Sequence, residues 1–416
     1  MKKTRLLSAA AALLVLTGCG AGAAESRPQS SSPRSAASSA SDSSQAESSL
    51  PKLTKDDVRM TRSAEYFFDR LEDERFKQAA LITLEGLRDH SEAISLESLD
   101  LYDNEFDDIF DLLISCEPEL GWVENNYELD IDTNDDSIIT AYFKYKLSRE
   151  EEEAAVEKLK AVVTEVNAAA AGLDDFGRML YFHDYIVTEC DYSTETGNAW
   201  SAYGCLVDGK AVCEGYSKAL IALCEEADML CIPVGGSYAQ NSSALHMWNK
   251  VVMDGEWYNM DVTWDDPTDA NDSPVKEEKD GIDYIHRDYF GLTDKETETD
   301  HRFTETSVLK YPAADAVEDN YFIRTGAYVS DPGEASDTIY RLAAEAAEKE
   351  EQIIQFRCSG SEVYDSVFEL EFSEDGRIFD ILGQLNREGY PVDPTGYRYI
   401  SDKERCIITI LIDYSK

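Results

Sequence analysis

The chain has 416 residues and a formal net charge of −46 at pH 7. This excess of acidic side chains argues against nucleic-acid binding, because few cations are available to neutralise phosphates. Hydrophobic residues make up 43% of the sequence, enough to build a core in two or three domains. We interpret the acidity mainly as a solvated surface that keeps the protein soluble, with a preference for cationic substrates as a weaker alternative.

Residues 1–18 have the pattern of a signal peptide. Three basic residues precede an apolar run over residues 6–16, which is too short to span a bilayer. The small residues Thr17 and Gly18 directly before Cys19 resemble a bacterial lipobox, in which the cysteine becomes the lipidated first residue. An ordinary secretory signal with an incidental cysteine is the alternative. We expect an extracytoplasmic protein anchored to the bacterial cell membrane by lipid on Cys19 alone.

The remaining chain is predicted to consist of a linker and three folded regions. Residues 19–55 are rich in serine and are expected to form a disordered linker that follows the lipidated cysteine. In residues 56–171, helical periodicity over 64–90 and 106–116 precedes two strands around a polar turn. A further helix is predicted after Ser148, which has the capping-box spacing to Glu151. Residues 312–416 mix strands and helices and are predicted to be a separate α/β domain.

Cysteine usage gives no evidence of a disulfide framework. Besides Cys19 the sequence has eight cysteines at irregular spacings, and no CxxC pair that would suggest zinc or a redox motif. We expect most of them to be buried thiols.

Residues 172–311 contain the candidate nucleophile, within GKAVCEGYSKALIALC. Cys213 stands at the predicted start of a helix, where partial positive charge and N–H groups favour a thiolate and offer hydrogen bonds to an oxyanion. Gly215 would allow another backbone segment to approach closely. The alternative is that Cys213 only packs in the core.

The segment LHMWNKVVMDGEWYNMDVTWDDP, residues 245–267, is predicted to be a β-hairpin that turns at Asp254-Gly255. With a two-residue loop, His246 and Asp261 become diagonal neighbours on one face, within reach of a side-chain hydrogen bond. A three-residue loop would put them on opposite faces. The hairpin therefore offers Cys213 a general base and a carboxylate that orients it.

These two motifs, together with FHDYIVTECDY, resemble those of the transglutaminase-like superfamily, especially its bacterial exported members. The resemblance extends from Phe176 to roughly Phe303. It implies an α+β fold with a papain-like core, in which the cysteine-bearing helix packs on an antiparallel sheet, flanked by two smaller α/β regions. It also implies that Cys213, His246 and Asp261 are the catalytic triad.

Other residues near the motifs also have candidate roles. Tyr203 could assist the oxyanion hole, although core packing is an equal alternative. Trp248 shares the predicted face of His246 and could shield the histidine–aspartate pair from water, or simply pack across the strands. We expect Asp265 and Asp266 to shape the following turn, and His183 to pack in the core.

The triad suggests attack on an amide carbonyl and a thioester intermediate, with a peptide or protein as substrate. We favour hydrolysis by a peptidase or amidase, while protein crosslinking by amine transfer and a catalytically silent binding or adhesion protein remain alternatives. No cofactor or metal is expected, because His90, His286 and His301 show no metal-ligand spacing.

Overall fold

The computed structural model describes residues 3–8, 52–266, 285–374 and 376–414. Cys19 and nearly all of the predicted linker lie outside these residues. The chain divides into two compact units, Met1–Leu159 with Val234–Met247 and His301–Tyr311, and Lys160–Pro233 with Trp248–Asp300 and Pro312–Lys416. The predicted domain boundaries stay a prediction. Among the described residues, each helix is too short or too polar to cross a lipid bilayer.

The N-terminal part of the first unit combines helices with a four-stranded sheet. The strand order is β1-β3-β4-β2, and the pairs are antiparallel. The predicted helix over 64–90 is in fact two helices, because Asp73 accepts the Arg75 N–H at 2.8 Å and caps a new helix. The elements are α1 (Arg62–Phe68), α2 (Glu74–Arg88), α3 (Asp103–Cys116), β1 (Lys3–Ser8), β2 (Ala93–Ser95), β3 (Asn126–Ile131), β4 (Ile138–Tyr142) and short 3₁₀ turns at Glu97–Leu99 and Pro118–Leu120. Helix α4 (Arg149–Ala169) begins in the first unit, and its residues from Lys160 onward belong to the second.

Two N-terminal details bear on the sequence predictions. The capping box is confirmed, because Glu151 accepts the Ser148 N–H at 2.9 Å directly before α4. Strand β1 falls within the predicted signal peptide, so cleavage before Cys19 would remove it and leave β3 at the edge of the sheet.

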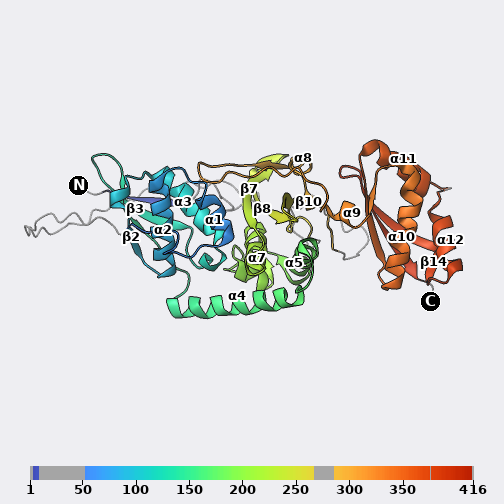
Figure 1. Ribbon diagram of the computed structural model, residues 1–416, viewed down its shortest axis with the longest axis horizontal. Helices are drawn as coiled ribbons and strands as arrows, with labels where there is room; N and C mark the ends of the chain where they lie inside the picture. Colours follow the sequence, from blue (N-terminus) through green and yellow to red (C-terminus); the bar gives the residue numbers. More distant parts are fainter. Residues whose placement is uncertain (1–2, 9–51, 267–284, 375, 415–416) are drawn as a thin grey trace, which may run out of the picture. The chain divides into compact units, whose positions relative to one another are not determined.

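A five-stranded sheet, ordered β10-β9-β8-β7-β11, forms the central part of the chain. Helix α7 packs on it, because Asn249 of β8 donates to the Ser217 carbonyl and hydroxyl of α7 at 3.2 and 3.0 Å (Figure 1). This confirms the α+β core with a cysteine-bearing helix on a sheet. The elements are α5 (Asp175–Glu189), α6 (Ala202–Leu206), α7 (Cys213–Glu226), α8 (Asp294–Thr297), β5 (Asp191–Tyr192), β6 (Lys210–Ala211), β7 (Cys231–Tyr238), β8 (Asn241–Met253), β9 (Glu256–Met260), β10 (Phe290–Leu292) and β11 (His301–Phe303).

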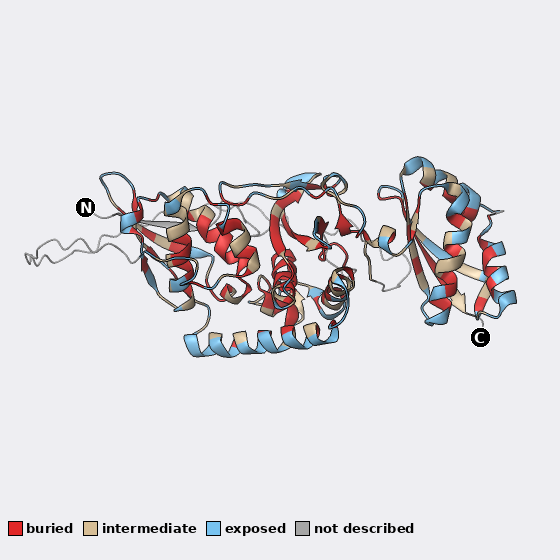
Figure 2. Ribbon diagram, in the orientation of Figure 1, coloured by how far each residue is buried: buried red, intermediate tan, exposed pale blue. Residues whose placement is uncertain are grey.

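The C-terminal residues of the second unit form a mixed sheet, β12-β13-β15-β14, and several helices, of which α10, α11 and α12 are the longest. Alternate residues of β13, Ile354, Phe356 and Cys358, share one apolar core with these helices. Figure 2 shows that α10, α11 and α12 carry both buried and exposed residues, as helices with a single apolar face should. The elements are α9 (Tyr321–Arg324), a 3₁₀ turn at Pro332–Glu334, α10 (Ala335–Glu348), α11 (Ser361–Phe372), α12 (Ile378–Glu388), β12 (Tyr328–Val329), β13 (Ile353–Cys358), β14 (Val392–Asp402) and β15 (Ile407–Tyr414).

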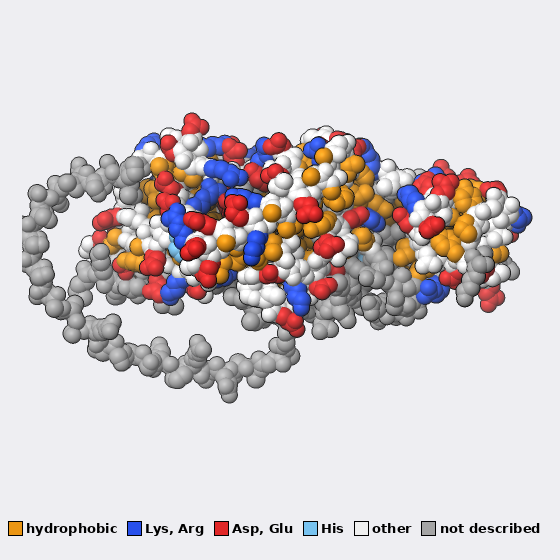
Figure 3. Space-filling model, turned by 90° about the horizontal axis from the view of Figure 1, so that it is seen from below, with side chains coloured by type: hydrophobic (Ala, Val, Ile, Leu, Met, Phe, Trp, Pro, Cys, Tyr) orange, Lys and Arg blue, Asp and Glu red, His pale blue; other side chains and the backbone are white. Residues whose placement is uncertain are grey.

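The charges on the surface and the burial of the cysteines agree with the sequence analysis. On the face seen in Figure 3, acidic side chains are interspersed with basic and apolar ones. The eight cysteines of the described residues are buried, and none of them forms a disulfide. The prediction of buried thiols is therefore confirmed for this part of the chain.

Candidate active site

Cys213 is the first residue of helix α7 and is 2% exposed. The helix begins where the Val212 N–H donates to the Ala199 carbonyl at 2.9 Å. A side chain on Gly215 would lie only 2.5 Å from that same carbonyl oxygen and 2.7 Å from the Ala211 Cβ. The predicted close backbone approach beside Cys213 is therefore confirmed, and it requires glycine.

The β8–β9 hairpin has the two-residue turn that the sequence predicts. Met253 pairs with Glu256, and the regular register continues to Asn249 opposite Met260. Asp254 and Gly255 form the turn with φ values of +48° and +89°, as a hairpin of this length needs. The next pair in the same register would be Trp248 and Asp261, so the predicted parity of the hairpin is confirmed up to the end of β9.

His246 lies in β8 and is 1% exposed. Its ring is 5.4 Å, between centroids, from both Tyr238 and His301. The pairing of His301 with Tyr238 across β11 and β7 explains this arrangement. His301 was not expected here from the sequence, because a three-residue strand far along the chain has no periodic signal that gives its partner.

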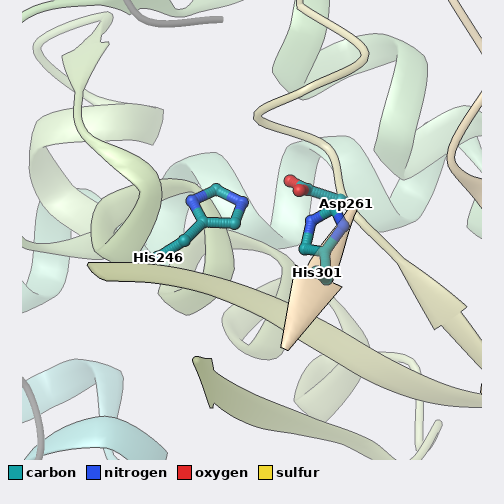
Figure 4. A group of neighbouring side chains, drawn as sticks. All are labelled: His246, Asp261 and His301. Atoms are coloured by element: carbon teal, nitrogen blue, oxygen red, sulfur yellow. The ribbon is translucent and has the colours of Figure 1, made fainter. Parts of the chain in front are cut away.

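The structure groups His246 and His301 with Asp261. One side-chain nitrogen or oxygen atom from each residue lies within 4.8 Å of those of the other two, and all three residues are buried. Figure 4 shows the His246 ring and the Asp261 carboxylate facing each other, with His301 beside the carboxylate. The predicted proximity of His246 and Asp261 is thus present, while the contact of either residue with Cys213 stays a prediction.

Two imidazoles and one carboxylate are also a set of ligands that binds Zn²⁺ or Fe²⁺. These three are the residues that could hold a metal ion at this place. Such an ion would engage the nitrogen and oxygen atoms of His246 and Asp261. Metal binding and the use of His246 as a proton acceptor would therefore exclude each other.

Asp261 follows β9 directly and is 3% exposed. Its Oδ1 accepts the N–H groups of Thr263 and Trp264 at 3.1 and 3.2 Å. Its own N–H donates to the Tyr289 carbonyl at 3.3 Å. The backbone around Asp261 is thereby fixed, and the buried carboxylate is satisfied on one oxygen by two main-chain donors.

Residues 160–262 match the family model of the transglutaminase-like superfamily. These residues are a transglutaminase-like domain. The match includes Cys213, His246 and Asp261, and it supports a domain of the cysteine-enzyme type. No match was found among curated protein sequences.

Similar solved structures include a transglutaminase, a candidate cysteine protease from Cytophaga hutchinsonii and menin, described with its binding site for the Mixed Lineage Leukemia protein. Their sequence identities are 15%, 15% and 14%, and their TM-scores are 0.25, 0.24 and 0.24. The matches cover 35%, 40% and 77% of this chain, and 44%, 56% and 62% of those chains. Similarity at this level carries no argument about function.

Asp265 lies just beyond the matched part of the transglutaminase-like domain. It is within a turn, as expected, but its buried carboxylate also accepts the Tyr289 N–H at 3.1 Å and contacts His183 Nε2 at 3.0 Å. The neighbouring Asp266 carboxylate contacts the buried Tyr216 hydroxyl of α7. These aspartates therefore lie in the turn as expected and in addition bind distant partners, because buried carboxylates need hydrogen-bond donors.

His183 of α5 is fully buried, as expected, but it is not an apolar core residue. Its second ring nitrogen contacts the Asp184 carboxylate at 2.9 Å. Burial opposes the charge on His183, but the two carboxylates outweigh burial and raise its pKa above the usual value. Burial likewise opposes ionisation of Asp184, yet its pKa is lowered by His183 and by Arg287, which donates to it at 2.6 Å.

The two auxiliary residues, Tyr203 and Trp248, both lie in the transglutaminase-like domain. Tyr203 is half-buried on α6, which packs against α7. Trp248 is 1% exposed, and its indole N–H donates to Asn259 Oδ1 at 3.3 Å. Their roles as oxyanion donor and water shield stay predictions.

Proposed function

We propose that the transglutaminase-like domain is a thiol enzyme that opens amide bonds of peptides or proteins through a Cys213 thioester. The observation that carries the proposal is the proximity of the His246 ring and the Asp261 carboxylate, both buried, in a domain that matches this superfamily. Cys213 at the N-terminus of α7 adds a nucleophile in a position that favours the thiolate.

In the proposed reaction, the Cys213 sulfur attacks the amide carbonyl carbon, and the carbonyl oxygen becomes an oxyanion. N–H groups at the start of α7 stabilise that negative charge. The carbon–nitrogen bond then breaks while protonated His246 gives its proton to the leaving amine, which leaves a thioester on Cys213. Asp261 orients the imidazole and stabilises its charged form.

Water completes the cycle in the favoured version of the proposal. His246 accepts a proton from water as it attacks the thioester, and the acid product leaves as the thiolate returns. A primary amine would instead give a new amide and crosslink two proteins. Hydrolysis is favoured because it is the common expectation for bacterial members of this superfamily.

The test combines a set of peptides with a primary amine, and mass spectrometry scores hydrolysis against amine incorporation. We expect hydrolysed products from the unmodified protein and a loss of about 10³-fold or more for Cys213→Ala and His246→Ala. His90→Ala is the matched control, because it removes a histidine that contacts Glu152, outside the transglutaminase-like domain. Its activity should be unchanged.

Thiol labelling with iodoacetamide checks the nucleophile without a known substrate. Cys213 should react faster near neutral pH than the other thiols, and His246→Ala should remove that difference. Slow, equal labelling of all cysteines would contradict the proposed enzymatic function and favour a catalytically silent binding protein. Exclusive amine incorporation would replace hydrolysis by crosslinking.

The proposal also includes the location, a lipid anchor on Cys19 outside the cytoplasm. Cell fractionation tests it: the unmodified protein should sediment with membranes, and Cys19→Ala should not. Equal distribution of the two proteins would contradict lipid anchoring.

A further inference from the structure

One face of strand β13 contacts the segment that follows the transglutaminase-like domain. Alternate residues of β13 enter the C-terminal apolar core, so Gln355 and Arg357 point to the opposite face. Gln355 donates to the Asp288 carboxylate at 2.8 Å, and Arg357 pairs with Glu296 at 3.1 Å. These two contacts join the C-terminal sheet to residues 286–300.

Arg405 makes a third set of contacts between the C-terminal sheet and residues 286–300. Arg405 lies between β14 and β15 and is 7% exposed. Its guanidinium carbon is 3.5 Å from the centre of the Tyr289 ring, which indicates stacking or a cation–π contact. One arm of the guanidinium donates to the Asp288 carbonyl at 3.3 Å, and the other forms an ion pair with the Asp300 carboxylate.

Tyr289 is the residue that connects this contact to the candidate site. Its hydroxyl donates to Asp300 at 3.0 Å, so Arg405 and Tyr289 share one carboxylate. Burial raises the pKa of Tyr289 well above its usual value, which keeps this donor protonated. The Tyr289 carbonyl accepts the Asp261 N–H at 3.3 Å, and its N–H donates to Asp265.

We propose that Arg405 is a positioning residue for the reaction. Arg405 holds Tyr289 in three ways, because it stacks on the Tyr289 ring, donates to the carbonyl of Asp288 and shares the Asp300 carboxylate with the Tyr289 hydroxyl. The Tyr289 carbonyl in turn accepts the Asp261 N–H and fixes the backbone there. The inference rests on the proposed function. A guanidinium can stack on a ring and donate in two directions at once, whereas an ammonium cannot reproduce that planar geometry. The C-terminal sheet then contributes to catalysis without touching substrate.

Arg357 provides a matched control for this idea. Arg357 lies in β13, Arg405 lies in the turn between β14 and β15 of the same sheet, and both pair with a carboxylate of residues 286–300. Arg405 alone of the two contacts Tyr289, the residue that holds the Asp261 N–H. Arg405→Gln and Arg357→Gln each remove one ion pair, but only Arg405→Gln also removes the contact with Tyr289.

The experiment measures the rate of Cys213 alkylation by iodoacetamide from pH 5 to 9 in the full chain, with urea unfolding of each variant alongside. Arg405→Gln should lower the rate at neutral pH by about 10- to 100-fold, as for other residues that orient a reactive group from outside. The pH of half-maximal rate should move up, because a poorly oriented His246 stabilises the thiolate less. Arg357→Gln should keep the rate and the pH profile, and Arg405→Lys should lose at least several-fold.

An unchanged pH profile in folded Arg405→Gln would overturn the inference while leaving the proposed function intact. Equal loss of rate in Arg405→Gln and Arg357→Gln would also overturn it, since the role would then be docking alone. If Arg405→Gln does not fold, Arg405→Lys decides, and full retention of rate in that variant overturns the inference. Slow Cys213 labelling in the unmodified protein would overturn the proposed function, and this inference with it.

Discussion

Cys213 and Asp261 are held in place by different kinds of interaction. Beside Cys213, helix α7 begins in close contact with the Ala199 backbone, and Asn249 joins the same helix to β8 by neutral hydrogen bonds. Beyond Asp261, the chain is fixed by buried charges, with Asp265 against His183 and with Arg405 against Asp300. The contacts that join the start of α7 to Ala199 and β8 depend on shape and on neutral hydrogen bonds, although α7 itself also contains a buried ion pair between Glu214 and Lys218. The contacts beyond Asp261 depend on a complete set of charged partners.

This difference predicts which changes would disturb the position of Cys213 and which would disturb the position of Asp261. Close packing tolerates changes of pH but not an added carbon atom. Buried charges tolerate small changes of shape but not the loss of one partner, because the remaining charge is then buried without compensation. Substitutions on the two sides should therefore differ in size and in their dependence on pH.

Removal of His183, one of the buried charged residues beyond Asp261, should have the largest effect on stability. His183→Ala leaves Asp265 buried without the contact at 3.0 Å, and we expect the free energy of unfolding to fall by about 3–5 kcal/mol. Urea unfolding followed by tryptophan fluorescence measures this change. A loss below about 1 kcal/mol would mean that these charges contribute little, and the comparison with the Cys213 side would fail.

His183→Gln tests the same contact through its pH dependence. The pKa of His183 is raised in the folded protein, so its contribution is complete below the unfolded value of 6.5. Above 6.5 the unfolded chain releases this proton first, and the free energy of unfolding falls until the raised folded pKa is passed. The pKa of Asp265 is raised by burial and gives a slope of the same sign, whereas Asp184, with a lowered pKa, loses its contribution only in acid.

The unmodified protein should therefore lose stability as the pH rises above 6.5, and His183→Gln should have a flatter profile. Unfolding measured in urea at several pH values gives both slopes. Parallel slopes would show that His183 is not the group that titrates.

The same contrast explains how much of the site the sequence predicts. Helix α7, the Asp254-Gly255 turn and the parity of His246 and Asp261 depend on residues close in the chain, so periodicity and turn chemistry suffice. The α+β core was expected from the resemblance of these motifs to the transglutaminase-like superfamily. Local signals decide these features.

The supporting residues depend on contacts between distant segments. Arg405 is 105 residues from Asp300, and His183 is 82 residues from Asp265. No local pattern specifies such partners, so the sequence reveals only that a buried carboxylate needs one. For the same reason the grouping of His301 with His246 and Asp261 was not expected.

The smallest expected effect is at Gly215, where the start of α7 packs closely against Ala199. Gly215→Ala puts a Cβ 2.5 Å from the Ala199 carbonyl oxygen, and we expect a loss of about 1–3 kcal/mol from overpacking, with little dependence on pH. Gly383→Ala in α12 is the matched control, because its Cβ would meet only the flexible Arg387 side chain, at 3.3 Å. In a helix interior that change should stabilise the protein by about 0.5–1 kcal/mol. Urea unfolding should therefore give opposite signs for the two variants, and equal signs would mean that helix propensity, not contact with Ala199, decides the outcome at Gly215.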